Sequence, residues 1–232
     1  MNSGGDLVEI WIPDGGFEIQ RGKVKATDGS SAVTDCLVPK WSNDELMVVR
    51  PLHRQPCLHR VLADCRHDQI VKLANLYGLL TLTIPRKPEP GKAVHADLLP
   101  PEPLDVWHRE IRALRAAAEM WDASKNRELV ARRITERLAR TSFHLIATTD
   151  GGGKIALRYR PTLLIDAIWQ QFAREAAGII HCARCRAPNC GRRFPRNDRQ
   201  YCSRACRMRA WRQAGERTIE ETLSSPSPLR GR

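Results

Sequence analysis

The chain has 232 residues, 42% of them hydrophobic, which allows one large domain or two modest ones. No apolar run approaches the length of a membrane span, and the opening MNSGGDLVEIW lacks the basic and then apolar order of a signal peptide. We therefore expect a cytoplasmic protein, in which Cys36, Cys57 and Cys65 are unpaired thiols. The net charge of +12 makes a polyanionic partner plausible.

Residues 1–84 predict a small N-terminal α+β region. Apolar pieces at 7–12 and 45–50, between turn residues, predict short strands. A later helix is expected to begin near Asp68 and to end at Gly78. The stretch 51–67 also contains several histidines and cysteines, but it has a helical apolar stripe and no knuckle glycine, so we expect ordinary helix and loop there rather than a metal site.

Six prolines between Pro85 and Pro103 predict a linker at 85–103, because proline interrupts both helices and sheets. Residues 104–180 then predict a helical region that contains a hairpin. Its first helix has an apolar seam from Trp107 to Trp121, and its partner helix is expected at 125–140. The seam residues are Trp107, Ile111, Leu114, Ala118 and Trp121.

Residues 142–149 and 154–160 alternate as two strands around a Gly-rich turn that ends at Lys154. A Gly-rich phosphate loop is the alternative, but such a loop leads into a helix and carries Ser or Thr after the lysine. We therefore predict a β-hairpin. Pro161 then begins a helix that is expected to end near Gly178.

The most informative stretch lies between Cys182 and Trp211, where five of the eight cysteines occur. Two close cysteine pairs joined by a polar loop are the usual sequence form of a zinc site. Cys182 also forms a C-x-x-C with Cys185, so the ligand set has to be chosen. Gly191 marks Cys190 as the second ligand of a tight turn, and Ser203 reads as the N-cap of a helix that has Cys206 in its first turn. The predicted Zn²⁺ ligands are Cys185, Cys190, Cys202 and Cys206.

The segments CRAPNCGRRF and YCSRACRMR resemble the bacterial CGNR-type zinc finger, a C-terminal module usually attached to an α-helical domain. The resemblance covers about thirty residues and implies a treble-clef-like finger, with Phe194 as its packing aromatic, in a transcription regulator. Cys206-Arg207-Met208-Arg209 replaces the tetrapeptide that names the family, and the final cysteine pair is one residue closer than the family pattern.

The fold class expected from these observations is α+β, with a mainly helical body, short strands and a hairpin, and a small C-terminal zinc finger. The finger is expected at 181–214, and a disordered tail at 215–232.

Positive charge is concentrated in the finger. Residues 182–217 carry eleven arginines against Asp198 and Glu216, which leaves +9 of the total +12. Arginine suits phosphate, so nucleic acid, and DNA in particular, is the expected partner. The candidate contact residues are Arg192, Arg193, Arg204, Arg207, Arg209 and Arg212.

Three functions remain open at this point. The first is a DNA-binding regulator whose body senses a ligand or self-associates. The second is a protein-interaction adaptor in which zinc only folds the C-terminus. An enzyme is the third, although we expect none because no nucleophile–base pair or paired carboxylates are visible. Trp211 is also open to two interpretations, as a core residue packed against the preceding body or as an exposed surface for stacking or groove contact.

Overall fold

The computed structural model describes residues 10–25, 31–40, 46–49, 51–54, 57–81, 101–124, 126–141, 143–149, 155–195 and 199–213. The chain divides into two compact units, Met1–Ile179 and Ile180–Arg232, which we call the body and the C-terminal module. The fold is α+β, as the sequence predicts. The predicted tail at 215–232 and most of the predicted linker lie outside the described residues.

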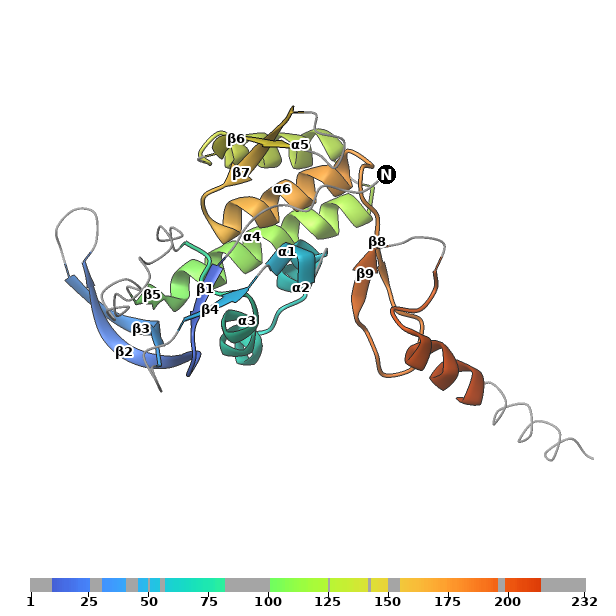
Figure 1. The fold of residues 1–232 in the computed structure, drawn as a ribbon, viewed down its shortest axis with the longest axis horizontal. Coiled ribbons are helices and arrows are strands. Elements are labelled where there is room, and N and C mark those ends of the chain that lie inside the picture. The colour runs from blue at the N-terminus through green and yellow to red at the C-terminus, as the bar shows by residue number, and fades with distance from the viewer. Residues whose placement is uncertain are drawn as a thin grey trace, which may run out of the picture. The chain divides into compact units, whose positions relative to one another are not determined.

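The elements follow one another as labelled in Figure 1. The strands are β1 (Ile10–Pro13), β2 (Phe17–Lys25), β3 (Ser31–Pro39), β4 (Leu46–Val49), β5 (Glu102–Pro103), β6 (Phe143–Thr149), β7 (Ile155–Pro161), β8 (Cys182–Arg184) and β9 (Arg193–Pro195). The helices are α1 (Pro51–Arg54), α2 (Leu58–Ala63), a 3₁₀ turn η1 (His67–Gln69), α3 (Ile70–Tyr77), α4 (Leu104–Asp122), α5 (Arg127–Leu138) and α6 (Leu164–Ala176), followed by a helix over residues 204–213.

The body is built around α4 and α6, which run side by side while α5 and the β6–β7 hairpin lie against α6 (Figure 1). Every predicted seam residue of α4 is buried except Trp121, which is half-buried. The apolar residues of α6 are buried as well, from Leu164 to Phe172. The antiparallel pairing of β6 with β7 confirms the predicted hairpin strands.

The N-terminal part holds more β structure than predicted. The expected pieces at 7–12 and 45–50 give β1 and β4, which pair with each other. The longer β2–β3 hairpin was not predicted, because charged residues and Gly22 interrupt its apolar alternation. Of its described side chains, Phe17 and Leu37 belong to the core. Such a strand pair is fixed by backbone hydrogen bonds more than by a sequence pattern.

Glu102 connects this region to α4. Its buried carboxylate accepts hydrogen bonds from the backbone N–H of Leu80 at 3.0 Å and of Thr81 at 2.6 Å, and from the indole N–H of Trp107. Burial raises the pKa of Glu102, while these hydrogen bonds act in the opposite direction. Because β5 also pairs with β3, the start of α4 is held from two sides.

Two of the three thiols expected to be unpaired, Cys36 and Cys65, are free and buried. Cys57 is disulfide-bonded, so the prediction that it is unpaired is wrong. Sequence position alone does not tell which thiols a fold brings within bonding distance. Burial raises the pKa of the Cys65 thiol to about 11, so at neutral pH this side chain is an uncharged core residue.

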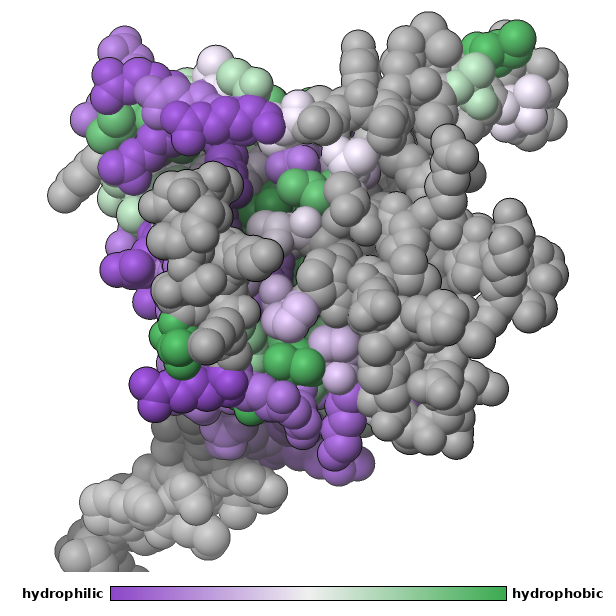
Figure 2. Space-filling model, turned by 90° about the vertical axis from the view of Figure 1, so that its left-hand side faces the viewer, coloured by the Kyte–Doolittle hydropathy of each residue, from purple (hydrophilic) through white to green (hydrophobic). Residues whose placement is uncertain are grey.

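On the face drawn in Figure 2, hydrophobic residues form small separated patches among hydrophilic ones. Exposed large aliphatic residues such as Ile19 and Ile155 belong to different strands. Among the described residues, no helix is long and apolar enough to cross a membrane.

A buried ionic network connects α2 with α6. Arg60 donates to both carboxylate oxygens of Glu175, at 2.7 and 2.9 Å, and His59 contacts the same carboxylate through Nε2. Arg60 also forms a two-point contact with Asp122 at the end of α4, with both distances at 2.9 Å. His59 reaches Gln171 through Nδ1 at 3.3 Å. Burial raises the pKa of Glu175, but the hydrogen bonds from His59 and Arg60 outweigh it and lower the pKa to about 2.

We expect Glu175→Gln to destabilise the body by about 3–5 kcal/mol, because the buried guanidinium of Arg60 loses its buried anionic partner and keeps only the more exposed Asp122. Asp122→Asn is the matched control. Asp122 contacts the same arginine but is 55% exposed, so its loss should cost about 0–1 kcal/mol. Chemical denaturation at pH 7 measures both changes in the free energy of unfolding.

At low pH, the free energies of unfolding of wild type and Glu175→Gln should become similar. A carboxylate with a lowered folded-state pKa stabilises fully above its unfolded pKa of about 4.3, and this contribution is lost as the pH falls toward about 2. The gap in unfolding free energy should therefore be widest above pH 5 and narrow toward pH 2. A gap that stays constant with pH, or an equal effect of Asp122→Asn, would contradict this account.

Candidate metal centre

The first two cysteines of the predicted set lie on the β8–β9 hairpin. Cys185 directly follows β8, and its N–H donates to the carbonyl of Arg192 at 2.9 Å. Cys190 closes a turn, with its N–H on the carbonyl of Ala187 at 3.2 Å. Gly191 has a φ of 58°, a left-handed conformation in which a side chain would be strained. The glycine thus allows the chain to turn back into β9 immediately after the second cysteine.

The other two cysteines lie at the start of the last helix. The backbone N–H of Cys206 donates to the Ser203 hydroxyl at 3.2 Å, which confirms the predicted N-cap. Cys206 is buried in the first helical turn, and Cys202 precedes the cap. The N–H of Cys202 lies 3.4 Å from the sulfur of Cys185, so a backbone donor already points at a sulfur from the other pair. Hairpin, loop and helix thus follow in the treble-clef order that was predicted.

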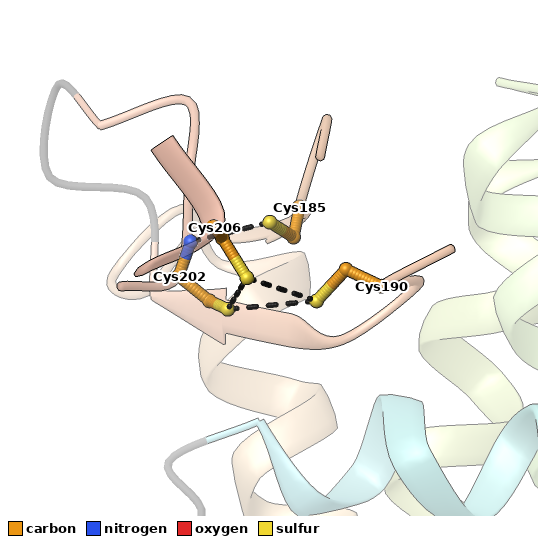
Figure 3. Close-up of side chains that lie close together, drawn as sticks. All are labelled: Cys185, Cys190, Cys202 and Cys206. Atoms are coloured by element: carbon orange, nitrogen blue, oxygen red, sulfur yellow. Dashed lines mark hydrogen bonds between the residues drawn. The ribbon is translucent and has the colours of Figure 1, made fainter. Parts of the chain in front are cut away.

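The four side chains point toward one another (Figure 3). The sulfurs of Cys190 and Cys202 are 3.7 Å apart, and each lies 3.5 Å from the sulfur of Cys206. All four sulfurs lie within 4.8 Å of one another. A tetrahedral ion with Zn–S bonds of about 2.3 Å places its sulfurs about 3.8 Å apart. The cluster could therefore coordinate one metal ion.

Because the sulfurs are crowded together, their thiol groups have different pKa values. Hydrogen bonding to Ser203 and to neighbouring thiols lowers the pKa of Cys206 to about 7. Burial and neighbouring sulfurs raise the pKa of Cys202 to about 12. A first thiolate forms readily at neutral pH, whereas full deprotonation requires a compensating positive charge. Metal binding to thiolates supplies this charge and releases the protons.

The module has few apolar contacts besides this cluster. Its buried residues are Cys185, Ala187, Phe194 and Cys206, with Tyr201 packed against them, so two of the four are themselves predicted ligands. Phe194 occupies the packing position that the family resemblance implies. A module with so small an apolar core depends on whatever its sulfurs bind.

Cys182 lies outside the set of four. It is part of β8, and its sulfur is disulfide-bonded. Among the described residues, the alternative C-x-x-C of Cys182 with Cys185 does not contribute to the four-cysteine group. The structure thus brings together the four cysteines chosen from the sequence.

The candidate arginines are distributed over the surface of the module. Arg193 in β9 is half-buried, and Arg209 donates to the carbonyl of Pro188 at 3.4 Å. The exposed ones are Arg192, Arg204, Arg207, Arg209 and Arg212. Trp211 is 61% exposed, whereas Phe194 and Tyr201 belong to the small core of the module.

A feature that the sequence did not reveal is a cavity of about 520 Å³ beside the helix start. Its lining includes Arg199, Tyr201, Arg204 and Arg207. Arg199 was not among the predicted site residues, because it precedes the helix and has no place in a helical periodicity. Only the fold brings it beside the arginines of the helix.

No family model and no curated protein matches this chain, so its function has to be argued from its own residues.

We expect one metal ion per chain and its loss in Cys190→Ser or Cys202→Ser, because a serine hydroxyl is a poor substitute for a thiolate ligand. Cys182→Ser should retain the ion, and Cys65→Ser controls for the number of thiols. Elemental analysis of the purified variants gives the metal content. Retention in Cys190→Ser together with loss in Cys182→Ser would overturn the assignment in favour of the C-x-x-C.

Chelation should unfold only the C-terminal module. Metal binding is expected to be its main stabilising contribution, whereas the body has its own apolar core. Limited proteolysis with a chelator should therefore cleave within residues 182–214 and leave a fragment of the body intact. Cooperative loss of the whole chain would contradict the independence of the two units.

Proposed function

We propose that the protein binds one Zn²⁺ through Cys185, Cys190, Cys202 and Cys206, and that the resulting finger contacts nucleic acid, most readily DNA, as part of a cytoplasmic bacterial transcription regulator. The resemblance to CGNR-type fingers supports the regulator. The observation that carries the proposal is the combination of a four-sulfur cluster with an arginine-rich exposed surface on the same small module.

Zinc is favoured by the chemistry of the donor set. Four thiolates in tetrahedral positions are typical of structural zinc and of iron–sulfur centres. The measured separations of 3.5–3.7 Å fit ligands that share a single ion. A set of four protein ligands leaves no open coordination position for a reacting water, so we infer a structural ion and a binding role rather than catalysis.

Nucleic acid is favoured by the type and the exposure of the charges. Every basic residue between 182 and 217 is an arginine, and this segment holds three quarters of the net charge of the chain. Guanidinium groups bind phosphate with two parallel hydrogen bonds, and contacts with a phosphate backbone release counterions. Five of the six candidate arginines are exposed, as such contacts require.

A protein-interaction adaptor is the second candidate, and one observation favours it. Trp211 and Met208 expose apolar surface on the same helix, and tryptophan and methionine are enriched at protein interfaces. The two candidates differ in their response to salt. Phosphate contacts weaken steeply as the salt concentration rises, whereas an apolar interface does not.

Replacing Arg204, Arg207 and Arg212 together with alanine should weaken nucleic-acid binding and leave the zinc content unchanged. Each lost phosphate contact should reduce the slope of log K against log salt by about 0.7–0.9. Fluorescence anisotropy with labelled oligonucleotides over a series of salt concentrations measures both effects.

The control is an equal loss of charge on the body, with Arg112, Arg132 and Arg140, all exposed, replaced by alanine. This variant should retain the wild-type slope, because its arginines are outside the module. Wild-type affinity of the module variant at every salt concentration, or no binding by wild type at low salt, would exclude the regulator and favour the adaptor.

A further inference from the structure

Trp211 is unusual among the aromatic residues of the described structure. It is the only aromatic among the large hydrophobic side chains that are exposed there. Trp107 and Trp169 are buried in the body, and Phe194 fills the core of the module. Exposing a tryptophan forgoes the stabilisation that burial of a large apolar side chain gives. Its position is therefore better explained by contact with a ligand than by folding.

The surroundings of Trp211 are cationic. The guanidinium carbon of Arg207 lies 5.6 Å from the centroid of its ring, a cation–π distance. Residues 199–213 include five arginines and no acidic residue. A protein partner of ordinary composition does not require this density of positive charge beside an aromatic ring, whereas a phosphate backbone does.

Arg207 also links the tryptophan to the cavity. It lines the cavity of about 520 Å³ together with Arg199 and Arg204, and none of the described residues that line it is acidic. A site for an anion and a site for a flat ring thus adjoin through one side chain. We call the set Arg199, Arg204, Arg207 and Trp211 the Arg–Trp surface.

We propose that the Arg–Trp surface binds single-stranded nucleic acid, with a phosphate in the arginine-lined cavity and an unpaired base stacked on Trp211. The inference rests on the proposed function and specifies its substrate. In a duplex, both faces of each base are already stacked, and only base edges and phosphates remain accessible. In a single strand the faces are free, and stacking on an aromatic side chain beside a basic groove is the usual mode of recognition.

The test uses the full zinc-loaded chain and three labelled probes: single strands of DNA and RNA of about 16 nucleotides, and the DNA duplex of the same sequence. Wild type should bind a single strand more tightly than the duplex. Trp211→Ala should weaken single-strand binding by about 5- to 160-fold, the equivalent of one stacked base, while the salt slope stays at the wild-type value. Duplex binding should change far less.

Two variants make the result specific. Trp211→Phe keeps an aromatic ring and should recover most of the affinity, even if the alanine variant proves poorly folded. Ile155→Ala removes an equally exposed apolar side chain from the body and should have no effect. The zinc content of each variant verifies that the module is intact.

The inference is overturned if wild type binds the duplex as tightly as the single strand, or if Trp211→Ala matches wild type. If Trp211→Ala loses affinity equally for the single strand and for the duplex, the inference is also overturned, because that result indicates a wedge inserted into a duplex. In each of these cases, salt-dependent binding of the duplex leaves the proposed function standing. Absence of binding to all three probes at low salt removes both.

Discussion

The fold of the C-terminal module depends on four sulfur atoms that lie within 4.8 Å of one another. As thiols they share protons unevenly, and as thiolates they repel one another, so the arrangement is most stable around a cation. Among the described residues, the apolar core of the module is small, and two of its four buried residues belong to the cluster itself. Its surface can consequently carry many arginines, since most of the candidate arginines are exposed rather than part of the core.

The body also encloses charged side chains, but it does so within a large apolar core. Glu175 is buried against Arg60 and His59, and Arg60 also binds the more exposed Asp122. This network connects the ends of α2, α4 and α6, whose apolar seams supply most of the burial. In the body, a large apolar core holds these charged side chains in place. In the module, the cysteine cluster holds the hairpin and the helix together.

The sequence predicted the parts of the fold that depend on local pattern. Helical periodicity located α4 and α6, and a serine at the correct spacing located the cap before Cys206. Cysteine spacing with Gly191 identified the four clustered sulfurs. In each case the physical cause acts within a few residues of the chain.

What the sequence did not predict depends on contacts between distant residues. The β2–β3 hairpin has a weak alternation, and Glu175 meets Arg60 across 115 positions. Neither the state of Cys57 nor the cavity at Arg199 has a local signal. The exposure of Trp211 was an open alternative, because burial of a lone tryptophan depends on contacts with distant residues.

The carboxylate of Glu102 has a consequence for how the chain can vary. It binds the backbone of Leu80 and Thr81, so the two ends of the intervening segment 82–100 are fastened at one point of the body. The entropy of closing a loop grows slowly with its length, by about 0.6 kcal/mol for each doubling. A longer connection between Thr81 and Glu102 would therefore cost little in closure entropy, and the hydrogen bonds of Glu102 would still fix the start of α4.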